Sequence, residues 1–211
     1  MTLARTVIRN AAVGVAVADK PQNLRAFLQP GCAAAIWRRQ PKPAFQPWID
    51  AIDPMRLPQG RIVLRPEAVP SAIHALCESA QTPDCAERDD LISDIGVLAK
   101  IFADLVSAPL VQVRLQVVTT NACRRFHIDA IAARLICTYR GPGTQYGVST
   151  DGQDPKRVFS VAKGAPILMR GTLSPTQPAP GLLHRSPPIE GTGEARLVLV
   201  LDAVNDPEEE A

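Results

Sequence analysis

The stretch Cys123-Arg124-Arg125-Phe126-His127-Ile128-Asp129 lies early in the part of the chain where strand-like patterns replace helical ones. It places an imidazole and a carboxylate two positions apart, in a sequence with only three histidines. On an extended strand, residues i and i+2 point to the same face. His127 and Asp129 would then supply two ligands of the facial triad that holds non-haem iron. His184, which precedes the last strand-like run, is the candidate for the third ligand.

Short strands are expected on both sides of this stretch. Residues 111–117 alternate strictly between apolar and polar side chains, which is the pattern of a half-buried strand. Further strand-like runs, separated by turns rich in glycine and proline, cover residues 132–139, 158–161, 166–170 and 196–202. The last run is apolar on both faces and is therefore expected near the centre of a sheet.

The first half of the chain has mainly helical patterns. The strongest covers residues 85–107, where apolar side chains recur every three or four positions and form one continuous face. Shorter helices are expected at 21–28, 45–52 and 66–80 and a strand at 13–17, whereas 33–37 fits either a strand or a short helix. Helices followed by short strands indicate an α+β fold. We expect N-terminal helices packed on a C-terminal double-stranded β-helix, a cupin-like jelly roll.

On this interpretation the chain divides into three parts. A mainly helical segment at 1–110 buttresses the barrel, residues 111–205 form the jelly-roll core with the metal site, and residues 206–211 are an acidic tail. In an antiparallel jelly roll the first and last strands of the core are spatial neighbours. His184 would therefore return to His127 at the mouth of the barrel.

Composition limits the partners and the compartment. The 211 residues carry a net charge of +2, which gives no reason to expect nucleic acid or an anionic membrane as a partner. No apolar run reaches the roughly 18 residues that span a bilayer. The run Ala11–Ala18 superficially resembles a short secretory segment but suits a strand equally well. Five cysteines without a CxxC pair indicate reduced thiols in a cytoplasmic protein.

Three motifs together carry a family resemblance. They are the stretch Cys123–Asp129, the turn Thr138–Thr144 (TYRGPGT) and the segment His184–Pro188 (HRSPP). The set resembles the hallmarks of an uncharacterised bacterial family known as domain of unknown function 1826. This resemblance covers most of the chain and implies no established activity.

A remoter resemblance, confined to residues 111–202, is to the oxygenases that depend on iron(II) and 2-oxoglutarate. These enzymes share a His-x-Asp motif, a distal His and a basic residue about ten positions later, an order that is present here in His127, Asp129, His184 and Arg196. The resemblance implies that the first three residues hold iron(II) on one face. Arg196 would clamp the far carboxylate of 2-oxoglutarate, because its planar guanidinium matches a carboxylate with two parallel donors.

The likeness to the prolyl-hydroxylase branch extends to the strand after the His-x-Asp motif. That branch carries an Arg, a Thr and a Tyr there, followed by a glycine-rich turn, and Arg134, Thr138, Tyr139 and residues 141–144 stand in those places. Tyr139 or Thr138 could donate a second hydrogen bond to the co-substrate, and Arg134 is an alternative clamp. The implied enzyme hydroxylates or demethylates an unknown small-molecule or protein substrate.

Cys123 keeps a zinc-binding interpretation open. It has the same strand parity as His127 and Asp129, although the residues before it suggest a turn that could break the register. A Cys123 thiolate, two histidines and an aspartate would close a tetrahedral zinc shell with no open position. The protein would then be a non-catalytic zinc-binding or metal-homeostasis module.

A third interpretation treats the histidines as structural. Arg196 would then pair with a nearby carboxylate, such as Glu194 or Asp202, and contribute little if the pair is exposed. The remaining histidine, His74, is expected at the surface or boundary of the helix at 66–80. The chain would in that case be an interaction domain.

Overall fold

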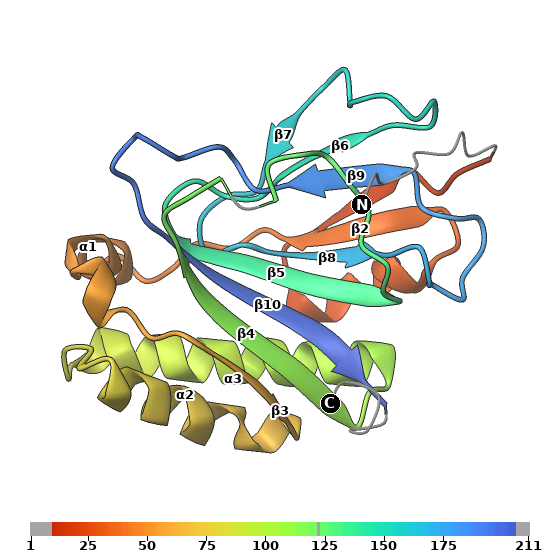
Figure 1. The fold of residues 1–211 in the computed structure, drawn as a ribbon. Helices are drawn as coiled ribbons and strands as arrows, with labels where there is room; N and C mark the ends of the chain where they lie inside the picture. Colours follow the sequence, from red (N-terminus) through yellow and green to blue (C-terminus); the bar gives the residue numbers. More distant parts are fainter. Residues whose placement is uncertain (1–9, 122, 206–211) are drawn as a thin grey trace.

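The computed structural model describes residues 10–121 and 123–205, which form three layers (Figure 1). A seven-stranded sheet lies in the middle, a three-stranded sheet lies over one of its faces, and the longest helices lie over the other. The acidic tail expected at 206–211 lies outside the described residues. None of the described helices is both long enough and apolar enough to cross a membrane.

The two sheets place strands from distant parts of the chain side by side. In order across the large sheet the strands are β1 (Gly14–Ala18), β2 (Cys32–Trp37), β8 (Pro166–Arg170), β5 (Ala133–Arg140), β10 (Arg196–Val204), β4 (Leu110–Val118) and β3 (Gly60–Leu64). The small sheet consists, in order, of β7 (Phe159–Ser160), β6 (Gln145–Val148) and β9 (Leu182–Arg185). Only β1 and β2 pair in parallel among these named strands.

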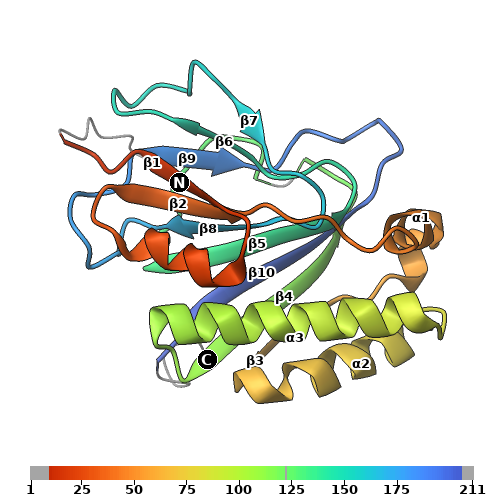
Figure 2. The same cartoon turned by 180° about the vertical axis from the view of Figure 1, so that it is seen from behind.

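The helical layer rests on the amphipathic pattern of α3. The helices are α1 (Phe45–Ala51), α2 (Val69–Ser79) and α3 (Ala86–Val106), with the 3-10 helices η1 (Pro21–Leu28), η2 (Pro54–Arg56) and η3 (Pro66–Ala68). Figure 2 shows α3 and α2 side by side against the large sheet. The predicted apolar stripe of α3 is fully buried at Leu91, Ile95, Leu98 and Phe102. Shortening one of these leucines to alanine would cost roughly 2–5 kcal/mol.

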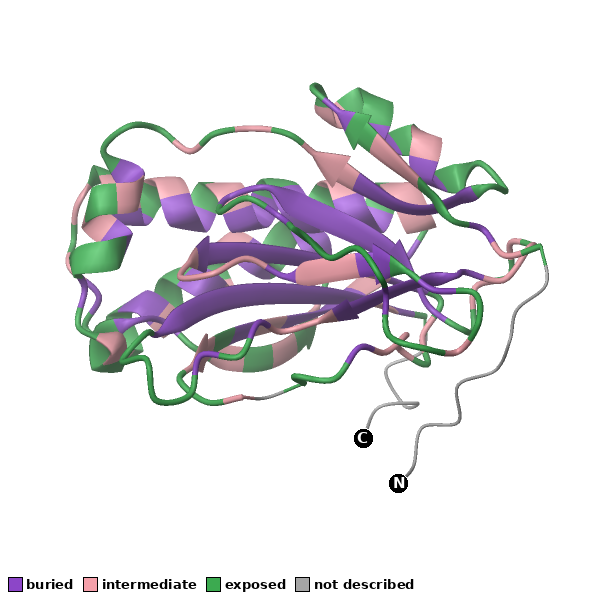
Figure 3. Cartoon of the chain, turned by 90° about the horizontal axis from the view of Figure 1, so that it is seen from above, coloured by how far each residue is buried: buried purple, intermediate pink, exposed green. Residues whose placement is uncertain are grey.

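Strand alternation gives the large sheet two different faces. Leu135, Cys137 and Tyr139 of β5 belong to a buried cluster on the helix side. Ile136, between them, belongs to a second cluster with Val198 and with residues of the small sheet, so that cluster lies between the two sheets. We call the first the helix-side cluster and the second, between the two sheets, the inner cluster. Figure 3 shows the buried strands enclosed by partly exposed helices and loops.

Sequence patterns miss part of this arrangement. The strands β3, β6 and β9 are not predicted, because each is short and flanked by loops. The ambiguous residues 33–37 form β2, which is held in the sheet by pairing with β8 far along the chain. Three strands from the first 110 residues thus join the large sheet, and the boundary expected at residue 110 runs through that sheet rather than beside it.

Candidate metal centre

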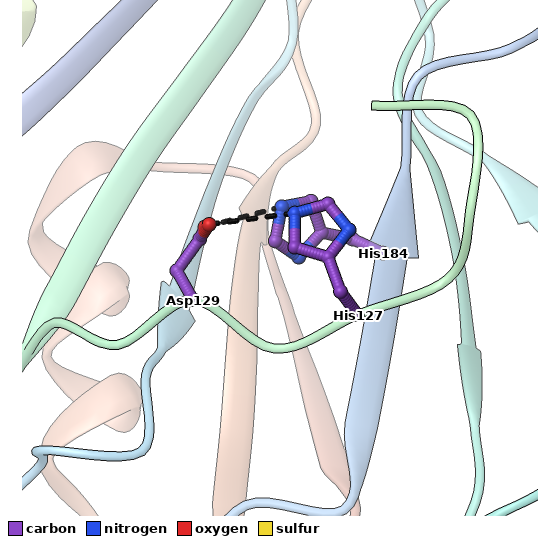
Figure 4. Close-up of side chains that lie close together, drawn as sticks. All are labelled: His127, Asp129 and His184. Carbon is purple, nitrogen blue, oxygen red and sulfur yellow. Dashed lines mark ion pairs between the residues drawn. The ribbon is translucent and has the colours of Figure 1, made fainter. Parts of the chain in front are cut away.

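The structure brings His127, Asp129 and His184 together (Figure 4). Each offers one potential ligand atom, and these three atoms all lie within 4.8 Å of one another. His127 Nε2 is 3.4 Å from Asp129 Oδ1, and His184 Nε2 is 3.2 Å from Asp129 Oδ2. We call this group the triad. Its members come from the two places in the chain that the sequence indicates.

Backbone pairing holds the two histidines next to each other. The amide of His127 donates to the carbonyl of His184 at 3.0 Å, and the reverse hydrogen bond has the same length. His184 belongs to β9, whereas His127 makes only this isolated bridge. The expected continuous strand through the His-x-Asp motif is therefore absent, because the chain makes one bridge and then bends toward β5. The amide of Thr172 fixes that bend by donating to the carbonyl of Asp129 at 2.9 Å.

A second contact fixes the donor nitrogen of His127. Its Nδ1 atom lies 2.8 Å from the carbonyl oxygen of Arg125. A carbonyl can only accept, so in the neutral ring we assign the proton to Nδ1 and the lone pair to Nε2. Outer hydrogen bonds of this kind orient histidine ligands in metal sites. Two imidazole nitrogens and one carboxylate are the donor set of non-haem iron(II) sites, so the residues present fit that metal.

The ionisation states of Asp129 and His184 suit a metal. Burial disfavours the charged form of Asp129, but hydrogen bonds from His127 and His184 and the charge of Arg134 hold its pKa far below the ordinary value. The hydrogen bond to Asp129 raises the pKa of His127, against the effect of burial, so a metal would have to displace a proton from this ring. Burial lowers the pKa of His184, which favours its neutral form. Metal binding needs an ionised carboxylate and neutral imidazoles.

Arg134 lies between two carboxylates rather than facing an open space. Its Nη1 atom is 2.7 Å from Asp129 Oδ2, and its Nε and Nη2 atoms donate to Asp202 at 2.6 and 2.8 Å. Asp202 also contacts Arg114 at 3.2 Å. Arg134 was an alternative clamp for the co-substrate, but here it tethers a triad carboxylate to β10. Asp202 was not predicted as part of the site, although it interrupts the apolar run of that strand.

Cys123 does not join the triad. Its side chain is exposed, and its backbone has φ of 51°, in the left-handed region. The turn breaks the strand parity on which the zinc interpretation depends. The carbonyl of Cys123 instead accepts a hydrogen bond from the amide of Ser186 at 3.1 Å. Over residues 10–121 and 123–205, the group able to hold a metal contains no cysteine.

Arg196 is buried, and among the described residues it has no carboxylate partner. It is only 1% exposed, its Nε atom donates to the carbonyl of Pro142 at 2.7 Å, and its Nη2 atom donates to Thr138 Oγ1 at 3.3 Å. No carboxylate within the described ranges forms an ion pair with it, Glu194 and Asp202 included. Burial lowers the pKa of Arg196 to about 10. A buried guanidinium without an opposite charge carries an uncompensated cost of desolvation, which a bound anion would offset.

The glycine-rich turn covers this arginine closely. Gly141 has φ of 74°, and a Cβ there would lie 2.8 Å from Arg196 Cγ. At Gly143 a Cβ would lie 1.8 Å from the carbonyl oxygen of Val161. The turn can therefore lie against both neighbours only with glycine at these positions. This close approach places the carbonyl of Pro142 where Arg196 Nε donates to it.

Tyr139 lies on the other side of the sheet, so its expected contact with the co-substrate is wrong. Its hydroxyl donates to Asp94 Oδ2 at 2.6 Å, and Asp94 in turn pairs with Arg39. Burial raises the pKa of Tyr139 well above the ordinary value. Thr138 and Tyr139 are neighbours on β5, so their side chains point to opposite faces of the sheet. Because Thr138 contacts Arg196 on the inner face, Tyr139 points to the helices. There it lines a cavity of about 310 Å³ with Phe45.

Solved structures of two plant dioxygenases are among those that match along nearly the whole chain. Dioxygenase for auxin oxidation 1 from Arabidopsis thaliana, in a binary complex with 2-oxoglutarate, has a TM-score of 0.53 and 10% identity over 93% of this chain and 94% of that one. The dioxygenase for auxin oxidation in rice has a TM-score of 0.52 and 11% identity, over 93% and 84%. At these identities the likeness is one of fold. It confirms the predicted remote resemblance to 2-oxoglutarate oxygenases at that level.

Sequence comparison gives the family. No curated protein matches the chain significantly. The family described as "Protein of unknown function (DUF1826)" matches residues 18–202, which is most of the 211 residues and includes the whole triad and Arg196. The three sequence motifs predicted this membership. The chain therefore belongs to the DUF1826 family.

Proposed function

We propose that this protein is an oxygenase that depends on iron(II) and 2-oxoglutarate, with the two sheets forming a double-stranded β-helix around its metal. The observation that carries the proposal is the convergence of two imidazoles and one carboxylate within 4.8 Å. That donor set leaves open positions for a co-substrate and dioxygen. The fold is similar to that of a dioxygenase whose structure was solved as a complex with 2-oxoglutarate.

Each triad residue has a defined task in this proposal. His127 and His184 present nitrogen lone pairs, and Asp129 presents a charged oxygen. When bound, iron(II) and 2-oxoglutarate would supply the reduction of dioxygen that oxidises the substrate. Arg134 holds the second oxygen of Asp129 at 2.7 Å, so the carboxylate keeps its orientation when the site is empty or filled. The backbone bridge does the same for the two histidines.

Arg196 and Thr138 would bind the far carboxylate of 2-oxoglutarate. Arg196 is buried and lacks an anionic partner among the residues placed by the structure, and Thr138 is its side-chain contact. A co-substrate carboxylate would provide the missing negative charge through charge-assisted hydrogen bonds. Tyr139 has no part in this, because its hydroxyl is bonded to Asp94.

The zinc-holding alternative predicts a fourth protein ligand. Cys123 was the candidate, and its exposed side chain lies outside the triad. We therefore favour a site with open positions, which is the property that catalytic metal sites share. All five cysteines are free, as is usual in a reducing compartment, so we place the enzyme in the cytoplasm. Its substrate is a small molecule or a protein.

Anaerobic titration of the purified protein with iron(II) and 2-oxoglutarate tests the proposal. The expected result is a weak visible charge-transfer band that His184→Ala abolishes. His74→Ala is the matched control, because His74 is the remaining histidine and lies exposed on α2. Cys123→Ala should keep the band. A wild-type protein that shows no band and retains zinc through purification, with zinc lost in both His184→Ala and Cys123→Ala, would establish the zinc module instead.

A further inference from the structure

Four aromatic side chains form one row across the small sheet. Phe159 of β7 pairs directly with Tyr146 of β6, Tyr146 pairs with His184 of β9, and the isolated bridge joins His184 to His127. Residues directly opposite each other on antiparallel strands carry their side chains on the same face. The Tyr146 and Phe159 rings stack with centroids 5.5 Å apart, and those of His127 and His184 are 4.5 Å apart. We call these four residues the aromatic row.

The aromatic row faces the space between the sheets. Tyr146 packs against the inner cluster, which includes Val198 of the large sheet. His184 has the same parity in β9 as Leu182, which also belongs to the inner cluster. The two histidines of the triad thus form one end of the row. Arg196 and Thr138, to which we assign the co-substrate, belong to the large sheet opposite. Tyr146 and Phe159 are the members of the row that neither the metal nor the co-substrate uses, so we assign them to the substrate.

Exposure rises along the row from His184 to Phe159. His184 is 7% exposed, Tyr146 is half-buried, and Phe159 is 44% exposed. Aromatic pairs commonly stabilise sheets by up to about 1 kcal/mol. That role alone does not explain why a phenylalanine on a strand of two residues is 44% exposed at the outer end of a row that leads to the triad. A graded row is instead suited to guide a flat apolar group inward.

The outer end of the row is held in a fixed place. The loop that leads to Phe159 lies directly on β6: a Cβ at Gly147 would be 2.4 Å from Pro155 Cβ and 2.5 Å from the carbonyl oxygen of Arg157. Ser149 closes the same loop by donating from Oγ to the carbonyl of Gln153 at 2.6 Å. Because the loop is already ordered, less conformational entropy is lost when a ligand binds against it.

Arginines lie near both ends of the row. The Arg157 guanidinium carbon lies 5.4 Å from the centroid of the Phe159 ring. Arg124 and Arg125 are exposed and directly precede the buried Phe126 before His127. None of these three arginines forms an ion pair with a carboxylate anywhere in residues 10–121 and 123–205. Unpaired cations at the rim of a site attract anionic ligands.

We propose that the aromatic row binds the substrate and that the substrate is an aromatic carboxylic acid. Its planar ring lies against Tyr146 and Phe159, its carboxylate is bound by Arg157, and its inner edge points to the triad. The inference rests on the proposed function, which supplies the metal and the co-substrate at the inner end. Tyr146, Phe159 and Arg157 thereby determine specificity.

Binding of three small probes tests this assignment. The probes are 2-naphthoate, its neutral analogue 2-naphthamide, and the non-planar anion cyclohexanecarboxylate, each titrated by NMR into the full-length protein. We expect 2-naphthoate to bind at least fivefold more tightly than the other two. Phe159→Leu should weaken it at least fivefold, and Arg157→Gln should remove the preference for naphthoate over naphthamide. Val97→Ser, on the helix-side cavity, is the control and should leave binding unchanged.

The anaerobic charge-transfer band is read in parallel and separates the two proposals. If the band forms but 2-naphthoate binds no better than the other probes, or binding responds to Val97→Ser and not to Phe159→Leu, the row is not the substrate site. If added naphthoate abolishes the band, it occupies the place of the co-substrate, and the assignment is also wrong. If the band never forms while the probe results hold, the oxygenase proposal fails and the binding site stands.

Discussion

The Nη1 atom of Arg134 lies 2.7 Å from the Oδ2 atom of Asp129, and this contact links the triad to the centre of the large sheet. The same guanidinium is bonded twice to Asp202 on β10. Asp202 is 6% exposed, so the link is shielded from solvent and from salt. Arg134 therefore acts as a positioning residue for a metal ligand.

Arg134→Gln should weaken metal binding about 10- to 100-fold, which is the usual effect of losing an outer partner of a metal ligand. Glutamine keeps much of the length but cannot bond two carboxylates. Iron(II) and zinc affinities of the metal-free protein would be measured by competition with a chelator. Arg114→Gln is the matched control, because Arg114 contacts Asp202 but not the triad. Equal losses in both variants would mean that Arg134 serves only the sheet.

Arg196→Gln should weaken 2-oxoglutarate binding about 10- to 100-fold, since a hydrogen bond to a charged group contributes about 1.5–3 kcal/mol. Because the buried charge has no carboxylate partner in the described ranges, its removal should not destabilise the fold. The affinity follows from the charge-transfer band, and stability from thermal unfolding. Unchanged 2-oxoglutarate affinity would assign the clamp to another residue.

Thr138→Val tests the same place without removing charge. It deletes the hydroxyl that accepts from Arg196 Nη2 at 3.3 Å and keeps the branched shape. We expect weaker 2-oxoglutarate binding by a factor of several, because Arg196 loses a fixing contact of about 1 kcal/mol. Iron(II) affinity in the absence of 2-oxoglutarate should stay at the wild-type value. A drop in iron(II) affinity alone would contradict this role.

Tyr139→Phe should lower stability without touching the metal site. The variant removes a hydrogen bond to Asp94 in the helix-side region, which costs about 1–3 kcal/mol. The Tm should fall by roughly 2–4 °C for each kcal/mol. The charge-transfer band and its dependence on 2-oxoglutarate should match the wild type. Loss of 2-oxoglutarate affinity in this variant would support the original expectation for Tyr139 and oppose the observed geometry.

Patterns within single elements predict much of this fold. The stripe of α3 and the alternation of residues 111–117 specify a helix and a strand without knowledge of their neighbours. β3 and β9 carry too few residues for such a pattern, and pairing with distant strands defines them. The ambiguous residues 33–37 are decided in the same way, by β8.

The site shows the same division. The positions of His127, Asp129 and His184 along the chain predict that they meet, because the first and last strands of a jelly-roll core lie next to each other. The roles of Arg134 and Tyr139 depend on the face of β5 to which each side chain points and on the charged residues that lie on that face. A single sequence does not specify those partners. Tyr146 was missed because its importance comes only from lying opposite His184.

The reciprocal hydrogen bonds between His127 and His184 have a consequence for how the protein acquires its metal. In many small metalloproteins the ion itself gathers the ligands, so that folding and loading are one event. Here peptide groups set the separation of the histidines. The polypeptide can therefore fold before any ion binds, and the supply of metal rather than folding would decide when the triad is filled.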